Sequence, residues 1–134
     1  MANVTGHARS NHFHVKDVES FKTEMGELGL QVIEEPDGRV CVLVVDDDCG
    51  CFPFARYDED EQDWVDVNVP AAIAPHLMDG EVCVLKEVSR MKLASLSGWA
   101  LAVNSEGETR SVSLDAIYDL AKEIAGPAST VNTF

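Results

Sequence analysis

The sequence predicts an α+β protein built on an antiparallel or mixed sheet of five to seven strands. Short alternating apolar stretches are joined by turn residues, as at 36–38 and 105–108, which is typical of hairpins. Only 17–28 and 113–125 carry the apolar period of a main helix, and we expect both helices on one face of the sheet. A third, short helix is expected at 70–79. At 134 residues the chain predicts a single domain, 1–134.

The first two elements follow from residues 1–28. Residues 1–10 are small and polar, so we expect a flexible start, and 128–134 predict a flexible tail. Residues 11–16 alternate and predict a short strand. Asp17 suits the N-cap of the first helix. The apolar face of this helix is formed by Val18, Phe21, Met25 and Leu28.

A hairpin is predicted next, with arms at 30–34 and 39–45 around the turn at Pro36–Gly38. The second arm is apolar without alternation, so both of its faces should be covered and it should be a central strand. A loop at 46–50 and an edge strand at 52–57, marked by Pro53, complete this half of the chain.

The second half predicts a helix, three strands and a last helix. Pro75 should start a new turn inside 70–79. Strands are expected at 81–88, 96–104 and 109–112, the last two as a hairpin. Small residues on one face of 96–104 predict a helix packed close against it: Gly98, Ala100 and Ala102. Ser113 should cap the last helix, whose expected buried face is Leu114, Ile117, Leu120, Ala121 and Ile124.

Charge is the least ordinary property of the chain. It carries 24 acidic and 10 basic side chains, for a net charge of −14. Twelve of the acids lie within 34–66, where only Arg39 and Arg56 oppose them. Such a chain repels nucleic acid and anionic membranes and favours basic partners, so direct binding to either is not expected. No apolar stretch approaches the ~20 residues of a membrane span.

A metal site is a different use of the 46–51 loop. Cys49 and Cys51, with His12 and His14, could supply four ligands to zinc, but the Cys-x-x-Cys spacing is absent. The three aspartates that open the loop resemble the start of a calcium loop, yet its twelfth position falls on Tyr57 instead of a glutamate. A metal-binding protein or metal-dependent hydrolase therefore stays a second hypothesis. Without a catalytic motif we expect no enzyme and no cofactor.

The acidic loops favour a protein-binding surface. Consecutive acids on an extended chain approach the linear charge density of duplex DNA, so a basic nucleic-acid-binding protein is the expected partner. Aromatic side chains among the acids suit interface anchors. The predicted binding residues are Asp46, Asp47, Asp48, Tyr57, Asp58, Glu59, Asp60, Glu61, Asp63 and Trp64. The charge could also serve only to keep the protein soluble, and a third hypothesis is an accessory domain that forms a homodimer through an open sheet edge.

Four stretches carry a resemblance: 11–17, 79–85, 99–104 and 113–118. In these the chain resembles small uncharacterised acidic proteins carried by phages, plasmids and other mobile elements. The resemblance implies a context in which anti-restriction and anti-CRISPR DNA mimics occur. The N-terminus lacks the basic and apolar regions of a signal peptide, so we expect the cytoplasm of the cell or of a host.

Overall fold

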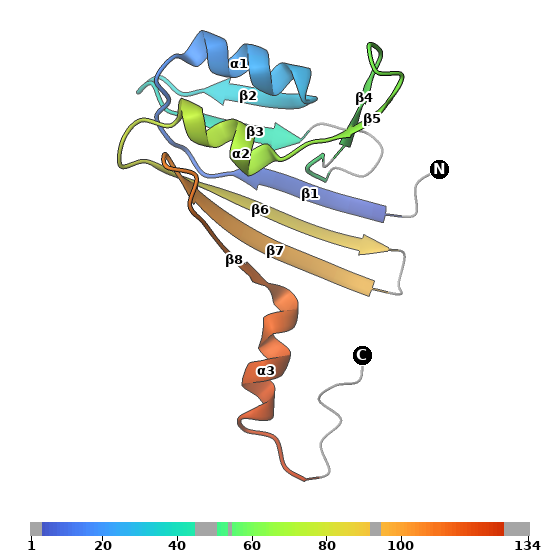
Figure 1. The fold of residues 1–134 in the computed structure, drawn as a ribbon. Helices are drawn as coiled ribbons and strands as arrows, with labels where there is room; N and C mark the ends of the chain where they lie inside the picture. The colour runs from blue at the N-terminus through green and yellow to red at the C-terminus, as the bar shows by residue number, and fades with distance from the viewer. Residues whose placement is uncertain (1–3, 45–50, 54, 92–94, 128–134) are drawn as a thin grey trace.

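The computed structural model describes residues 4–44, 51–53, 55–91 and 95–127. It contains a six-stranded sheet in the order β2-β3-β1-β6-β7-β8 and a separate two-stranded sheet, β4-β5 (Figure 1). All paired strands are antiparallel, which confirms the predicted α+β class. The strands are β1 (Val4–Ser10), β2 (Leu30–Glu34), β3 (Val40–Val44), β4 (Ala55–Asp58), β5 (Asp63–Asp66), β6 (Val82–Met91), β7 (Ser95–Asn104) and β8 (Thr109–Ser113). The helices are α1 (Val18–Glu27), α2 (Val69–Ile73) and α3 (Ile117–Lys122), with 3-10 turns η1 (Ala74–His76) and η2 (Leu114–Ala116).

Helix α1 forms as its apolar spacing predicts. The Asp17 carboxylate caps it, accepting hydrogen bonds from the Glu19 and Ser20 amides at 3.0 and 3.3 Å. Phe21 and Met25 are fully buried. The Phe21 ring meets Phe13 edge-on, with ring centroids 5.8 Å apart. This contact joins the helix to the segment that follows β1 and forms one part of the core.

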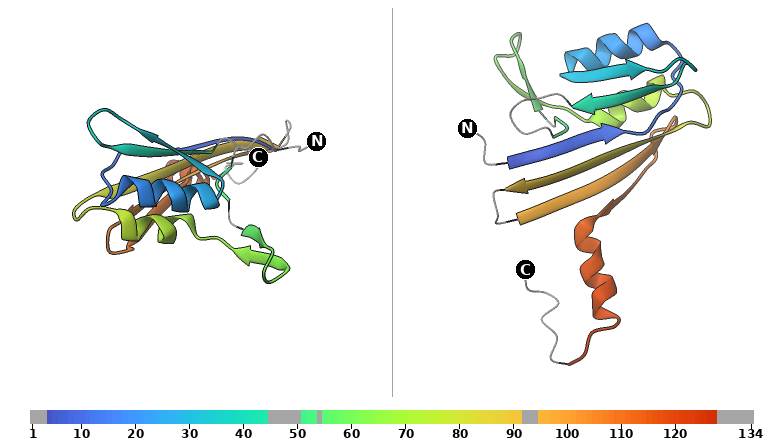
Figure 2. Two further views of the ribbon diagram at one scale, coloured as in Figure 1. Left: turned by 90° about the horizontal axis from the view of Figure 1, so that it is seen from above. Right: turned by 180° about the vertical axis from the view of Figure 1, so that it is seen from behind.

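Helix α2 and the η1 turn lie beside α1 on the same face of the sheet (Figure 2). The Asn68 side chain caps α2 by accepting from the Ala71 amide at 3.1 Å. Pro75 lies in η1, which starts directly after α2, so the predicted break into two helical turns is confirmed. The core between these helices and the sheet is formed mainly by Phe13, Phe21, Met25, Val40, Val42, Ile73, Leu77, Cys83, Leu85 and Val103.

The N-terminal segment corrects one prediction. Residues 4–10 are not a flexible start but strand β1, which pairs with β6 along its whole length. Ser10 is buried at the end of this strand, and its hydroxyl accepts from the Val42 amide of β3 at 2.8 Å. Residues 11–16 form two isolated bridges, Phe13 with Val40 and Val15 with Leu77, in place of the expected strand. Ladder hydrogen bonds from both neighbours stabilise β1, and the sequence of β1 alone does not reveal them.

The predicted hairpin of β2 and β3 is confirmed, with Leu30 opposite Val44 and Glu34 opposite Val40. Val40, Cys41 and Val42 are all buried, as expected for a strand covered on both faces. Val45, the predicted end of this strand, lies outside the described residues, as do 128–134.

The C-terminal part of the fold differs from the prediction in how its helix is placed. Strands β6, β7 and β8 are consecutive antiparallel partners, so no crossing helix among the described residues covers that end of the sheet, and α3 extends away from it (Figure 1). The apolar side chains expected to be buried are exposed instead: Leu114, Ile117, Leu120 and Ile124. Ser113 precedes η2 and makes no side-chain cap hydrogen bond, and α3 begins only after η2. The side chain of Leu114, and not a helix, packs on Gly98. A Cβ added at Gly98 would lie only 2.6 Å from Leu114 Cδ1, so a glycine is needed there.

Candidate functional site

The acidic stretch forms a hairpin that is separate from the main sheet (Figure 1). In the β4–β5 register, Tyr57 lies opposite Trp64, and Asp58 lies opposite Asp63. Six carboxylates and the single guanidinium of Arg56 occur between residues 55 and 66. The hairpin therefore concentrates negative charge at one projecting part of the molecule.

The turn at the tip of this hairpin directs its acids outward. The Asp58 carboxylate accepts hydrogen bonds from the amides of Asp60 and Glu61 at 2.9 and 3.4 Å. Gln62 closes the turn in the left-handed region, with φ of 53°. Glu59, Asp60 and Glu61 are exposed. Because backbone amides hold the turn, these three carboxylates are presented on an ordered element.

An aromatic side chain lies directly beside the acids. Trp64 is 66% exposed on β5, although a tryptophan of a folded protein is usually largely buried. The Asp63 carboxylate accepts from the Trp64 amide at 2.8 Å. An exposed tryptophan surrounded by charge is typical of an interface anchor.

The predicted binding residues are brought together only in part. The hairpin joins Asp58, Glu59, Asp60, Glu61, Asp63 and Trp64, together with the backbone of Tyr57. The second cluster, Asp46–Asp48, lies outside the described residues. Its place beside the hairpin stays a prediction.

The histidines of the zinc hypothesis are bound to carboxylates. His12 Nε2 lies 3.1 Å from Glu35 Oε1, and His14 Nδ1 lies 2.7 Å from Glu81 Oε1. The pKa of the Glu81 carboxyl group is lowered. The largest cause is the hydrogen bond from the His14 backbone amide, and the second is the hydrogen bond with the His14 imidazole. Within 4–44, 51–53, 55–91 and 95–127, no group of three or more metal-ligand side chains is arranged for an ion. Cys49 lies outside these ranges.

The other cysteines of the described strands are core residues, as predicted. Cys41 and Cys83 are buried in β3 and β6. Burial raises the pKa of the Cys83 thiol to about 12. This thiol therefore stays protonated and is not suited to nucleophilic or metal chemistry.

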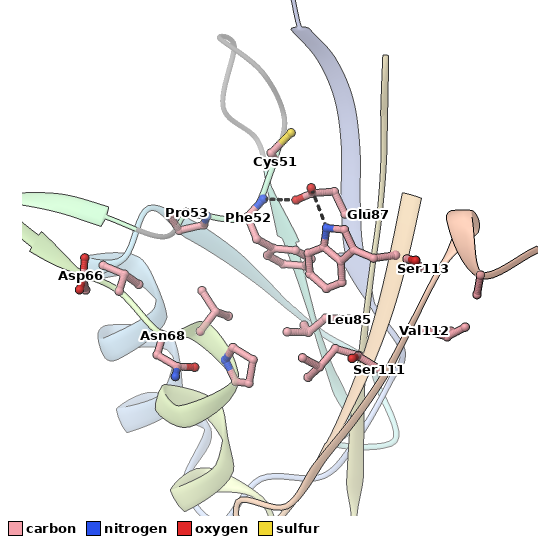
Figure 3. A pocket seen from close by; sticks show the side chains of 16 residues that line it. Cys51, Phe52, Pro53, Asp66, Asn68, Leu85, Glu87, Ser111, Val112 and Ser113 are labelled. Carbon is pink, nitrogen blue, oxygen red and sulfur yellow. Dashed lines mark hydrogen bonds between the residues drawn. The ribbon is translucent and has the colours of Figure 1, made fainter. Parts of the chain in front are cut away.

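Sequence reasoning missed an apolar cleft of about 1220 Å³ next to the hairpin (Figure 3). One wall is the β6–β8 surface, including Leu85, Trp99 and Leu101. The opposite wall is the chain at 66–70, which leads from the hairpin into α2, and the segment 51–53 lies at one end. The cleft is open because α1 and α2 cover only the other end of the sheet (Figure 2).

A single carboxylate organises the end of this cleft. Glu87 Oε1 accepts from the Phe52 amide at 2.8 Å, and its Oε2 accepts from the Trp99 indole at 2.9 Å (Figure 3). The Phe52 and Trp99 rings lie 5.9 Å apart and are tilted by 46°. With both oxygens used in this way, Glu87 holds two elements together and is not placed as a general base. The position of Glu87 on the same face of the strand as the apolar Cys83 and Leu85 was the available signal.

Comparisons with family models, curated proteins and solved structures found no match. Among the described residues, no helix is long and apolar enough to cross a membrane. The function is therefore inferred from the geometry of the hairpin, the cleft and α3.

Proposed function

We propose that the protein is a non-enzymatic binding module that recognises a basic partner protein through the β4–β5 hairpin. The observation that carries this proposal is the exposed Trp64 within an ordered, projecting field of carboxylates. Carboxylates give fast, steered association with a basic surface, and the indole gives the apolar contact that charge alone lacks.

The partner class that fits best is a protein with a Lys/Arg-lined groove for nucleic acid. The three exposed acids at 59–61 are consecutive and present closely spaced negative charges, as a phosphate backbone does. Inhibition of a defence complex, such as a restriction or CRISPR enzyme, is the specific form of the proposal. The proposed place of action is the cytoplasm of the cell or of a host.

Charge reversal at the hairpin tip tests this proposal. The variant E59K/D60K/E61K changes exposed side chains and leaves the Asp58 turn intact. Nucleic-acid-binding proteins of the native host, retained on a heparin column, serve as the probe. We expect the wild-type protein to release some of them at low ionic strength and the variant to release none. The release caused by the wild-type protein, above that caused by salt alone, should weaken as salt approaches about 0.5 M, where the Debye length falls below ~5 Å.

The matched control is E27K/D79K/E106K, which reverses three exposed acids elsewhere and gives the same net charge. If the control also fails to release the bound proteins, only overall charge matters and the hairpin is not the site. If both variants behave as the wild type, a basic partner is not bound through charge at all.

Trp64→Ala separates the aromatic anchor from the charge. Removal of a hot-spot tryptophan costs about 2 kcal/mol or more, which is roughly a 30-fold weaker complex. We expect this loss at every salt concentration, because net charge is unchanged. Titration of the captured partner measures it. Equal affinity of the Trp64→Ala variant and the wild type would show that electrostatics alone hold the partner.

A further inference from the structure

The C-terminal helix presents an apolar face that nothing in the described part of the chain covers. Ile117, Leu120 and Ile124 are 58%, 57% and 90% exposed. Ile117 and Leu120 are three residues apart in α3 and so lie on one side of the helix, and Ile124 follows in the turn after Lys122. A helix this short has little stability in water by itself and depends on a packed apolar face. The face of α3 therefore requires a covering surface.

The apolar cleft beside α2 is a surface of matching size. Helix α3, Ile117–Lys122, is ~9 Å long at 1.5 Å per residue and 10–12 Å wide, so it occupies roughly 700–1,000 Å³. The cleft holds about 1220 Å³, and its β6–β7 wall presents Trp99 and Leu101 above the buried Leu85. The molecule therefore has an uncovered apolar helix face and also an apolar cleft large enough for a helix of this length.

In this structure the helix does not turn back into the cleft of its own chain. Leu114 holds its base against Gly98, and Ala116 forms part of the rim of the cleft. At Ala116 and Ile117 the backbone is already helical, with φ/ψ of −60°/−21° and −62°/−26°, so no reversal occurs there. From this point α3 points away from the sheet (Figure 1).

We propose that α3 of one copy occupies the cleft of a second copy, and that the exchange is reciprocal. A twofold axis beside the rim formed by Val112, Ser113 and Ala116 brings each helix across the rim of the other chain. Both apolar surfaces are then covered by one symmetric contact. Glu59, Asp60, Glu61 and Trp64, on which the proposed function rests, do not line the cleft, so the inference is independent of the proposed function.

Ile117→Glu with Leu120→Glu tests the helix. Sedimentation equilibrium should give a dimer for the wild-type chain, twice its 14.6 kDa, at tens of micromolar. The double variant should dissociate at least about 100-fold more easily, because a carboxylate buried without a partner is strongly unfavourable. Its melting temperature under monomeric conditions should stay unchanged, since both sites are exposed. The matched control V82E/L96E changes two exposed apolar residues on the other face of the sheet and should still dimerise.

Trp99 tests the cleft directly. The chain has two tryptophans, so Trp64→Phe leaves Trp99 as the only indole. Its emission should lie at shorter wavelength in the dimer and shift to longer wavelength on dilution or in the I117E/L120E background. Dimerisation should strengthen with salt, because each copy carries a charge of −14. A dimer without a change at Trp99 would place the interface elsewhere. A monomer at tens of micromolar would overturn the proposal. This holds whether the emission of Trp99 shows an indole shielded by α3 of the same chain or an indole exposed to water.

Discussion

At the β2–β3–β1 end of the sheet, α1 and α2 cover one face, whereas at the β7–β8 end the same face borders an open cleft (Figure 2). The first end contributes fully buried side chains such as Phe21 and Val40. At the second end all five residues of β8 are exposed. The helices follow from the connections, because α1 joins β1 to β2 while β6, β7 and β8 are joined by hairpins.

This difference assigns separate tasks to the two ends. A covered end stabilises the monomer through burial, and an uncovered apolar end has surface available for another chain. The acidic hairpin differs from both, since it projects charge and not apolar surface. Salt should therefore weaken contacts of the hairpin and strengthen contacts of the cleft.

The largest expected effect compares one substitution at both ends. Leu77→Ala, at the fully buried position that follows η1, should lower the free energy of unfolding by about 2–5 kcal/mol. Leu101→Ala, on the cleft wall, should cost less than about half as much in the monomer, because Leu101 is only partly buried. Urea unfolding at low protein concentration measures both. Equal losses would show that the cleft end is packed as tightly as the helix-covered end.

A smaller effect is expected at the junction of the cleft with segment 51–53. Glu87→Gln replaces one of two accepting oxygens with a donor, which opposes either the Phe52 amide or the Trp99 indole. We expect a loss of about 1–3 kcal/mol, the usual cost of an unsatisfied buried partner. Near-ultraviolet circular dichroism of Trp99 should weaken in parallel. Glu106→Gln, on an exposed turn, is the control and should change neither quantity.

The smallest effect is a pH dependence at the covered end. Hydrogen bonds from His14 lower the pKa of Glu81 below its ordinary value of 4.5. This carboxylate therefore contributes stability above about pH 5, and the contribution is lost as pH falls through the lowered pKa. The stability difference between wild type and Glu81→Gln should shrink between about pH 6 and pH 3. Urea midpoints across this range measure it, and Asp79→Asn, an exposed neighbour, should show no such trend. A stability difference between the two proteins that does not change with pH would show that the ionised Glu81 carboxylate is not its source.

Local signals in the sequence were sufficient for several elements. The Asp17 cap and the spacing of the apolar residues that follow it determine α1. The turn residues Pro36–Gly38 determine the β2–β3 turn. Glu59, Asp60 and Glu61 are exposed at the turn of the β4–β5 hairpin, because consecutive charged side chains stay in contact with water. In each case residues within a few positions of one another supply the stabilising contacts.

Only the tertiary structure decided the rest. Strand β1 forms because it pairs with β6 along its whole length and with β3 at Arg9, although its own residues show no apolar periodicity. The cleft depends on Glu87 joining Phe52 to Trp99, residues far apart in a chain where no local pattern links them. The period of α3 correctly marked an apolar face, but amphipathicity does not specify what covers it. Local propensity depends on near neighbours, whereas burial depends on which distant segments the fold brings together.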